Sequence, residues 1–253
     1  MKLLHSPPPP QIICDVKYIE FLDSDDYLET DCIEIFVHIA QKYQLDLVCG
    51  GINQISKEYK KVYSTFGLFE KIERNKILDG IKIIKECKYN FFYGSWNILI
   101  NFNFFRDLDL YFINGIIYED HYFGTLLFIK SKEIYIVDRF FYNYVNSSES
   151  ITRPKEITKD RLLLNFHSWR TTIEKLEKDT QTLEEKQIIQ RHIKKFYFPM
   201  MCESFLLLDF PLQKEFKNEI KKFKKYTNLK VFLMLNFPKL FFLLRKIKKL
   251  SRG

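Results

Sequence analysis

Cysteine is scarce in this chain of 253 residues, and its distribution excludes two kinds of cross-linked protein. The cysteines are odd in number, widely spaced and never arranged as Cys-x-x-Cys: Cys14, Cys32, Cys49, Cys87 and Cys202. Neither a disulfide framework nor a zinc site is indicated. Reduced thiols in a cytoplasm fit this pattern best.

Long hydrophobic runs are also missing. Residues 1–10 hold one Lys and two consecutive Leu before four prolines, which is far short of a secretory signal. The most apolar window, residues 231–244, is interrupted by Asn236, Pro238 and Lys239, whereas a spanning helix needs roughly 18 apolar residues. We therefore expect no export and no transmembrane segment.

Acidic residues are nearly absent from the C-terminal end. Residues 214–253 contain thirteen Lys or Arg and two Glu, so this tail carries a net charge of +11 while residues 1–213 carry −3. Aromatic residues are plentiful, with 25 Phe and 15 Tyr, and 46% of the chain is hydrophobic. This composition is typical of a globular protein and excludes a low-complexity chain.

Hydrophobic periodicity predicts alternating strands and helices, followed by helices alone. The expected elements are strands at 16–22, 45–52 and 134–145, and helices at 33–40, 72–85, 118–129, 157–178 and 183–196. Gly50 and Gly51 predict a bulge or a close approach within the second strand. We expect an α/β fold with a helical C-terminal region, divided into a Pro-rich disordered leader (1–14), a catalytic domain (15–153), a helical appendage (154–213) and a basic amphipathic tail (214–253).

The first acidic motif, Tyr18-Ile-Glu-Phe-Leu-Asp-Ser-Asp-Asp26, ends a hydrophobic strand with several carboxylates. Ligands bind at the carboxyl ends of strands in open α/β sheets. Asp23 and Asp25 lie two residues apart, so a tight turn can direct both at one hard cation and leave its other positions for phosphate or water. The alternative is an ordinary solvated turn, because loops collect Asp.

The second acidic motif is Ile117-Tyr-Glu-Asp-His-Tyr-Phe-Gly124, at the predicted start of a helix. Glu119 and Asp120 suit that position as partners of the helix dipole or as caps, which is the alternative to a catalytic role.

Together with two further segments, these motifs resemble bacterial family-2 glycosyltransferases. Gly94-Ser-Trp-Asn97 is similar to that family's W-N/G-K-L element, and Arg139-Phe-Phe-Tyr-Asn-Tyr-Val-Asn-Ser-Ser-Glu-Ser-Ile151 looks like its Y-x-Y…N-x-S-I element. The resemblance covers residues 18–151, and four elements in order are more specific than any one alone. The overall pattern is most similar to lipooligosaccharide or lipopolysaccharide galactosyltransferases.

The resemblance implies a GT-A fold and an inverting transfer from a nucleotide sugar. Asp23 and Asp25 match the metal loop, which implies Mn²⁺ or Mg²⁺, and Asp120 matches the catalytic base. Asp26, Trp96 and Glu119 match positions that line the sugar or acceptor, although Trp96 fits a core position equally well.

The sequence departs from the family pattern in two places. Where several members place a metal-ligating His, this chain has Asn143, whose amide oxygen suits Mg²⁺ or Mn²⁺. His121 and His167 are further ligand candidates, with a core or surface role as the alternative. Only 22 residues precede Asp23, so we expect a partial GT-A sheet that lacks its first βαβ unit and is truncated at the N-terminus.

The basic tail interleaves lysines with Phe and Leu, which predicts an amphipathic helix at a membrane interface. The alternatives are a helix that packs its apolar stripe on the body and, less favoured, nucleic-acid binding; we expect no nucleic acid. The complete hypothesis is a peripheral enzyme on the inner face of the bacterial cytoplasmic membrane. It would transfer a hexose or N-acetylhexosamine, with UDP-galactose as the first donor to consider, to a lipopolysaccharide-type glycan or glycolipid acceptor. The alternative is an inactive remnant or a membrane-bound interaction module.

Overall fold

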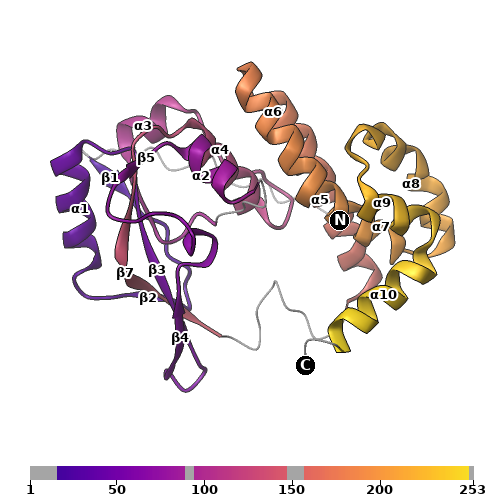
Figure 1. The fold of residues 1–253 in the computed structure, drawn as a ribbon, viewed down its shortest axis with the longest axis horizontal. Coiled ribbons are helices and arrows are strands. Elements are labelled where there is room, and N and C mark those ends of the chain that lie inside the picture. The colour runs from indigo at the N-terminus through magenta and orange to yellow at the C-terminus, as the bar shows by residue number, and fades with distance from the viewer. Residues whose placement is uncertain (1–15, 89–93, 147–156, 251–253) are drawn as a thin grey trace.

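The computed structural model describes residues 16–88, 94–146 and 157–250, and these contain one mixed sheet followed by a helical region (Figure 1). The strands follow the order β1 (Tyr18–Ile19), β6 (Ile98–Asn101), β3 (Leu47–Ile55), β7 (Ile134–Val145) and β2 (Tyr27–Leu28). In addition, β4 (Lys61–Thr65) pairs with β3, and β5 (Ile77–Leu78) pairs with β7. The long central strands β3 and β7 are parallel, and the other pairs are antiparallel.

The two faces of the sheet bury different side chains of the same strands, as the two-residue period of a strand requires. Val48 packs under α1 (Cys32–Tyr43), together with Phe36 and Phe141. Leu47 and Cys49 point to the opposite face and join the main core. That core includes residues of α2 (Gly80–Glu86) and α4 (Glu119–Lys130), while α3 (Phe102–Asp107) and the short 3₁₀ turn η1 (Gly67–Phe69) complete this part.

The predicted irregularity at Gly50 and Gly51 is confirmed. The pairing of β3 with β7 shifts register on both sides of Gly51. A Cβ at Gly50 would lie 2.7 Å from the ring of Phe141, and one at Gly51 would lie 2.4 Å from the ring of Phe140. Glycine is therefore required here because two bulky rings of β7 cover the β3 backbone.

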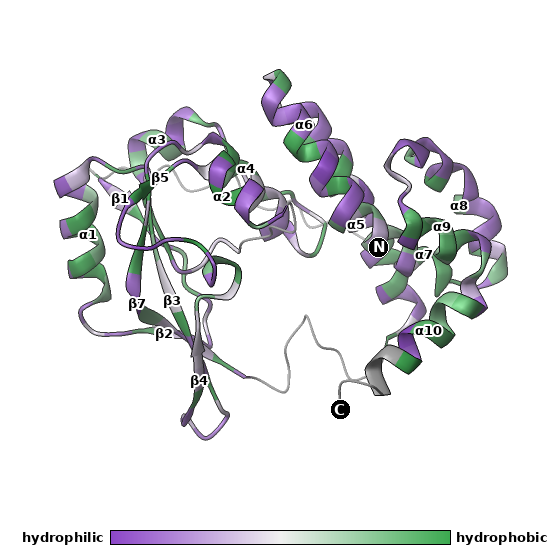
Figure 2. Cartoon of the chain, in the orientation of Figure 1, coloured by the Kyte–Doolittle hydropathy of each residue, from purple (hydrophilic) through white to green (hydrophobic). Residues whose placement is uncertain are grey.

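The helical region continues the same core. Its elements are α5 (Lys159–Asp179), α6 (Leu183–His192), the π-helical turn η2 (Ile193–Tyr197), α7 (Phe198–Leu206), α8 (Phe210–Lys222), the 3₁₀ turn η3 (Lys224–Tyr226), α9 (Leu229–Asn236) and α10 (Pro238–Leu250). Ile173, Phe198 and Val231 are fully buried in one cluster with the sheet residues. Figure 2 shows hydrophobic residues concentrated on α9, whereas α8 is mostly hydrophilic.

The predicted fold class, α/β with a helical C-terminal region, is confirmed. The strand at 134–145 has the predicted bounds, and the helices expected near 33–40, 118–129 and 157–178 are present with small shifts. The helix predicted over 72–85 is wrong in its first half. Asn75 has a positive φ of 58°, and Asp79 caps the helix by accepting a hydrogen bond from Lys82 N at 3.1 Å, so α2 begins only at Gly80. The predicted leader, residues 1–14, lies outside the described residues.

Within the described part of the chain, no helix combines the length and the hydrophobicity needed to cross a bilayer.

Candidate active site

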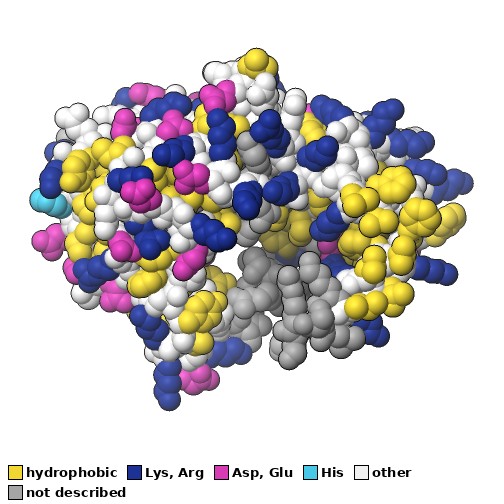
Figure 3. Space-filling model, viewed as in Figure 1, with side chains coloured by type: hydrophobic (Ala, Val, Ile, Leu, Met, Phe, Trp, Pro, Cys, Tyr) yellow, Lys and Arg dark blue, Asp and Glu magenta, His cyan; other side chains and the backbone are white. Residues whose placement is uncertain are grey.

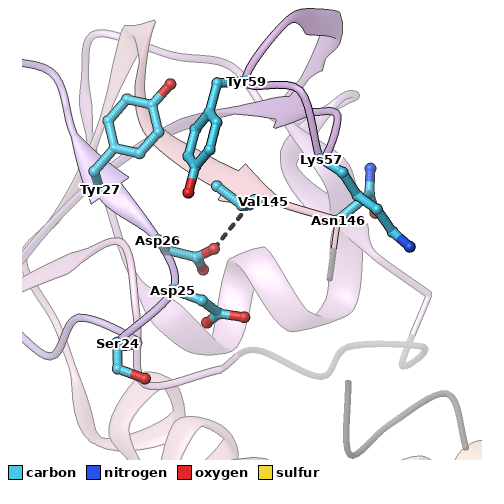
Figure 4. A pocket seen from close by; sticks show the side chains of 8 residues that line it. All are labelled: Ser24, Asp25, Asp26, Tyr27, Lys57, Tyr59, Val145 and Asn146. Carbon is cyan, nitrogen blue, oxygen red and sulfur yellow. Dashed lines mark hydrogen bonds between the residues drawn. The ribbon is translucent and has the colours of Figure 1, made fainter. Parts of the chain in front are cut away.

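The loop that carries the first acidic motif is tied to β7 through Asp26. The loop closes with a hydrogen bond from Asp26 N to Asp23 O at 3.1 Å. The buried Asp26 carboxylate accepts one hydrogen bond from the Tyr142 hydroxyl at 2.7 Å. It accepts a second from Val145 N at 2.8 Å, which Figure 4 shows. Both carboxylate oxygens of Asp26 therefore hold the loop in place, and the carboxylates of Asp23 and Asp25 stay exposed.

Trp96 packs beside Tyr142, the residue that donates a hydrogen bond to Asp26. Its ring packs on Tyr142 at a centroid distance of 4.8 Å and on Tyr144 at 6.1 Å. A Cβ at Gly94 would lie only 2.4 Å from the indole Nε1, so only glycine leaves room for the ring. Burial and the bond to Asp26 raise the pKa of Tyr142, which keeps its hydroxyl protonated as a donor. Trp96 thus supports the acidic loop, and it remains partly exposed.

The second acidic motif is held by α5. Tyr118, the residue before α4, has a positive φ of 62°, and its ring stacks on Trp169 at 4.8 Å. The Tyr118 hydroxyl accepts a hydrogen bond from Arg161 at 3.3 Å, and Ile117 N donates to the Ser168 hydroxyl at 3.0 Å. These contacts fix the first turn of α4, where Glu119 and Asp120 lie.

The two motifs, almost a hundred residues apart in sequence, share one electrostatic site. Burial, the charge of Glu119 and the charge of Asp23 raise the pKa of Asp120 to about 6. Partial burial and the charges of Asp25 and Glu119 likewise raise the pKa of Asp23. The acidic groups of the two motifs therefore lie within electrostatic reach of one another, through Asp23 on one side and Glu119 and Asp120 on the other, and Asp120 is ionised above about pH 6.

Asn143 does not point to this cluster. It follows Tyr142 on β7, so its side chain lies on the other side of the strand. There its amide oxygen accepts from Asn53 at 3.0 Å, and its amide nitrogen donates to Glu29 at 3.1 Å. The amide of Asn143 is thus committed to a buried polar network, and the structure does not bring it to Asp23 and Asp25.

The predicted histidines lie among aromatic rings. His121 is surrounded by Trp169, Phe196 and Tyr197 at centroid distances of 5.1 to 6.0 Å, and burial lowers its pKa to about 3. His167 contacts the rings of Phe166 and Phe216. Across residues 16–88, 94–146 and 157–250, no group of three His, Cys, Asp or Glu side chains is arranged to hold a metal ion. The carboxylates of Asp23 and Asp25 supply two hard oxygen ligands, which fits a cation that completes its coordination with phosphate and water.

Sequence reasoning missed two residues that support the site. Tyr142 could have been found from the alternation of β7, because it faces away from the network around Asn143. Tyr197 carries no such signal. Its fully buried hydroxyl donates to His121 O at 3.1 Å and lies 2.9 Å from the Thr125 hydroxyl, so the π-helical turn reaches the first turns of α4 across 76 residues of sequence.

A cleft of about 460 Å³ opens beside Asp25. Tyr27 and Tyr59 lie over Asp26 on one side, and Lys57 extends next to Asn146 on the other (Figure 4). Aromatic rings and carboxylates are groups that bind sugars, and a cation is a group that binds phosphates.

Comparison with known proteins agrees with this architecture. No family model matches the chain. In structure, it is similar to Staphylococcus aureus TarS residues 1–349, with a TM-score of 0.56 and 16% identity over 87% of this chain and 58% of that one. A second TarS structure, in complex with UDP-GlcNAc, gives a TM-score of 0.55 and 16% identity over 86% of this chain and 60% of that one. The fold is therefore GT-A-like, as expected.

Two curated relatives share sequence with the chain, and both are named glycosyltransferases. Streptococcus pneumoniae glycosyltransferase GlyA is 23% identical over 149 residues, which is 54% of this chain and 20% of that protein. The uncharacterized glycosyltransferase EpsJ of Bacillus subtilis is 26% identical over 141 residues, which is 53% of this chain and 39% of that protein. The chain thus spans well under half the length of these relatives.

Proposed function

We propose that the chain is a glycosyltransferase that transfers a hexose or N-acetylhexosamine from a nucleotide sugar to a hydroxyl group of a glycan. The observation that carries this proposal is the acidic site formed by two separate motifs, in which the charge of Asp23 helps to raise the pKa of Asp120 and the charge of Glu119 helps to raise that of Asp23. The names of both curated relatives support the reaction class. The TarS complex with UDP-GlcNAc supports a UDP-sugar donor, and UDP-galactose is the other donor to test.

Asp23 and Asp25 are the residues that would hold a divalent cation, Mg²⁺ or Mn²⁺. Each is exposed, and their mutual repulsion is relieved when positive charge is added between them. Such a cation would bind the donor diphosphate and stabilise the charge that develops on the leaving nucleoside diphosphate. The bonds from Tyr142 and Val145 to Asp26 keep this loop in position.

Asp120 is the proposed general base. In its ionised form it accepts the proton of the acceptor hydroxyl while that oxygen attacks the anomeric carbon. Attack from the face opposite the leaving group inverts the configuration. Burial, with the charge of Glu119 as a second cause, raises the pKa of Asp120 to about 6, which is close to neutral pH, where a general base is effective. Asp26, Trp96 and Glu119 remain the predicted sugar-side or acceptor-side residues.

Calorimetry with UDP, UDP-galactose and UDP-GlcNAc, with and without Mn²⁺, tests the proposal. We expect nucleotide binding that depends on the metal and is lost in Asp25→Asn but kept in the control Asp107→Asn, which changes an exposed carboxylate on α3. Asp120→Asn should abolish sugar transfer and leave donor affinity nearly unchanged. If the wild-type chain shows no metal-dependent nucleotide binding, it is an inactive remnant or an interaction module.

The acceptor belongs to the same proposal. We infer a lipopolysaccharide-type or other lipid-carried glycan, presented at the inner face of the bacterial cytoplasmic membrane. The support comes from a surface outside the acidic site, the outer side of α9 and α10.

A further inference from the structure

The last two helices expose an apolar stripe. In α10, Leu240, Leu243, Leu244 and Ile247 are 45 to 55% exposed. Their spacing of i, i+3, i+4 and i+7 places them on one side of the helix. An amphipathic helix on a water-soluble domain normally turns such a stripe toward the core. In α10 the stripe faces outward instead.

The opposite sides of both helices are already used for packing. Val231 and Met234 of α9 are fully buried in the main core, and Phe241 of α10 packs against that core. Arg245 forms an ion pair with Glu203 of α7. Both helices are thus anchored by one side, and repacking against the body cannot bury the stripe without breaking these contacts.

The exposed residues of the two helices form one continuous surface. The ring of Phe232 on α9 contacts that of Phe237, at the bend just before Pro238, with a centroid distance of 6.2 Å. Figure 3 shows hydrophobic side chains gathered on the right of the molecule, where α9 and α10 lie in Figure 1. We call this surface the docking face; it comprises Leu229, Phe232, Phe237, Leu240, Leu243, Leu244 and Ile247, all at least 45% exposed.

The charged residues of the two helices that carry the docking face are all basic. Neither α9 nor α10 contains an acidic residue, and the exposed Lys230, Lys239 and Lys246 accompany the apolar stripe. A second copy of the chain would bring two basic surfaces together, which is unfavourable. Nucleic-acid phosphates would pair with the lysines and leave the Leu and Phe side chains in water. An anionic bilayer satisfies both kinds of group, because acyl chains take the apolar residues and headgroups take the lysines.

We propose that the docking face binds the surface of an anionic lipid bilayer, with its Leu, Ile and Phe side chains in the interface and its lysines over the headgroups. This binding does not depend on the chemistry at Asp120. The consequence for the acceptor rests on the proposed function: a membrane-bound enzyme would reach a glycan that is carried on a lipid.

Co-sedimentation of the full chain with vesicles tests the proposal. We expect binding to phosphatidylcholine vesicles that contain about 30% phosphatidylglycerol, with little binding to pure phosphatidylcholine and a fall at high salt. Replacing Leu243 and Leu244 with Gln should lower the partition coefficient at least about tenfold, because two apolar side chains leave the interface. The matched control is Leu183→Gln, since Leu183 is 73% exposed on α6 and should not affect binding.

Equal partitioning of wild type and the Leu243→Gln, Leu244→Gln variant would overturn the proposal. So would concentration-dependent dimers in sedimentation velocity that this variant abolishes, because the docking face would then be a protein interface. Both changed residues are exposed, so the variant should fold normally, and circular dichroism checks this. Metal-dependent UDP binding by the same variant should match wild type, so a failure of docking and a failure of the proposed transferase activity give different results.

Discussion

Glu20 gives the sharpest test of the structure, because its carboxylate is buried without a hydrogen-bond partner among the described residues. It follows β1, and both of its carboxylate oxygens are inaccessible and lack hydrogen-bond partners among the described residues. Burial raises the pKa of Glu20 from 4.5 to about 7. The folded protein therefore binds a proton more tightly at this site than the unfolded chain does.

The sign of the effect on stability follows from this difference. Well below pH 4.5 the side chain is protonated in both states, so its ionisation makes no contribution to the free energy of unfolding. Between pH 4.5 and 7 the unfolded state ionises first, so the free energy of unfolding falls as the pH rises. Above pH 7 the loss is complete and amounts to about 3 kcal/mol, since one pKa unit corresponds to about 1.4 kcal/mol.

Glu20→Gln removes this titration. Urea unfolding followed by circular dichroism should show the variant gaining about 2–3 kcal/mol over wild type at pH 8 and little or nothing at pH 4.5. The control is Glu34→Gln, an exposed acid in the first turn of α1, which should leave the pH dependence as in wild type. A Glu20→Gln variant with the same pH dependence as wild type would refute the burial described here.

Three further outcomes are expected. Transfer activity should rise with pH through about 6, because Asp120 must lose its proton to act as a base, and a flat pH–rate profile between 5 and 7 would contradict that role. Tyr142→Phe removes a donor to Asp26, so thermal unfolding should show a loss of about 1–3 kcal/mol and calorimetry a weaker metal-dependent binding of UDP. Gly80→Ala would place a Cβ 1.8 Å from the Phe128 carbonyl oxygen, so α2 must move away from α4; we expect a loss of about 2 kcal/mol or more in urea unfolding, and unchanged stability would argue against this close crossing.

The long elements could be predicted from the sequence because each is long enough to show a pattern of its own. The helices α1 and α5 bury positions three or four residues apart, whereas α4 buries an unbroken apolar run and β7 is rich in Ile, Tyr and Phe. The strands β2, β4 and β5 were missed, since they have only two to five residues and are fixed by partners far away in sequence. The sequence of a short strand does not show which distant strand it pairs with.

The candidate site likewise has residues that the sequence predicts and residues that it does not. The motifs around Asp25 and Asp120 were visible because their carboxylates stand at the end of a strand and at the start of a helix. Of the residues that hold them, Tyr142 could have been found from the alternation of β7, whereas Trp169 and Tyr197 act through contacts that only the folded chain creates. Asn143 was placed in the metal site by its neighbours in sequence, whereas the two-residue period of β7 turns its amide to Asn53.

The contact between α4 and the C-terminal helices determines how the protein should respond to truncation. The Tyr122 hydroxyl donates to Asp179 at 2.7 Å, and Thr125 bonds to Tyr197. The helix α4, which carries Asp120 in its first turn, is therefore held by residues at the end of α5 and in η2. A fragment that contained only the sheet would lose these hydrogen bonds and expose a large hydrophobic surface. We therefore expect limited proteolysis to yield no stable minimal catalytic fragment, and scanning calorimetry of the whole chain to show a single melting peak.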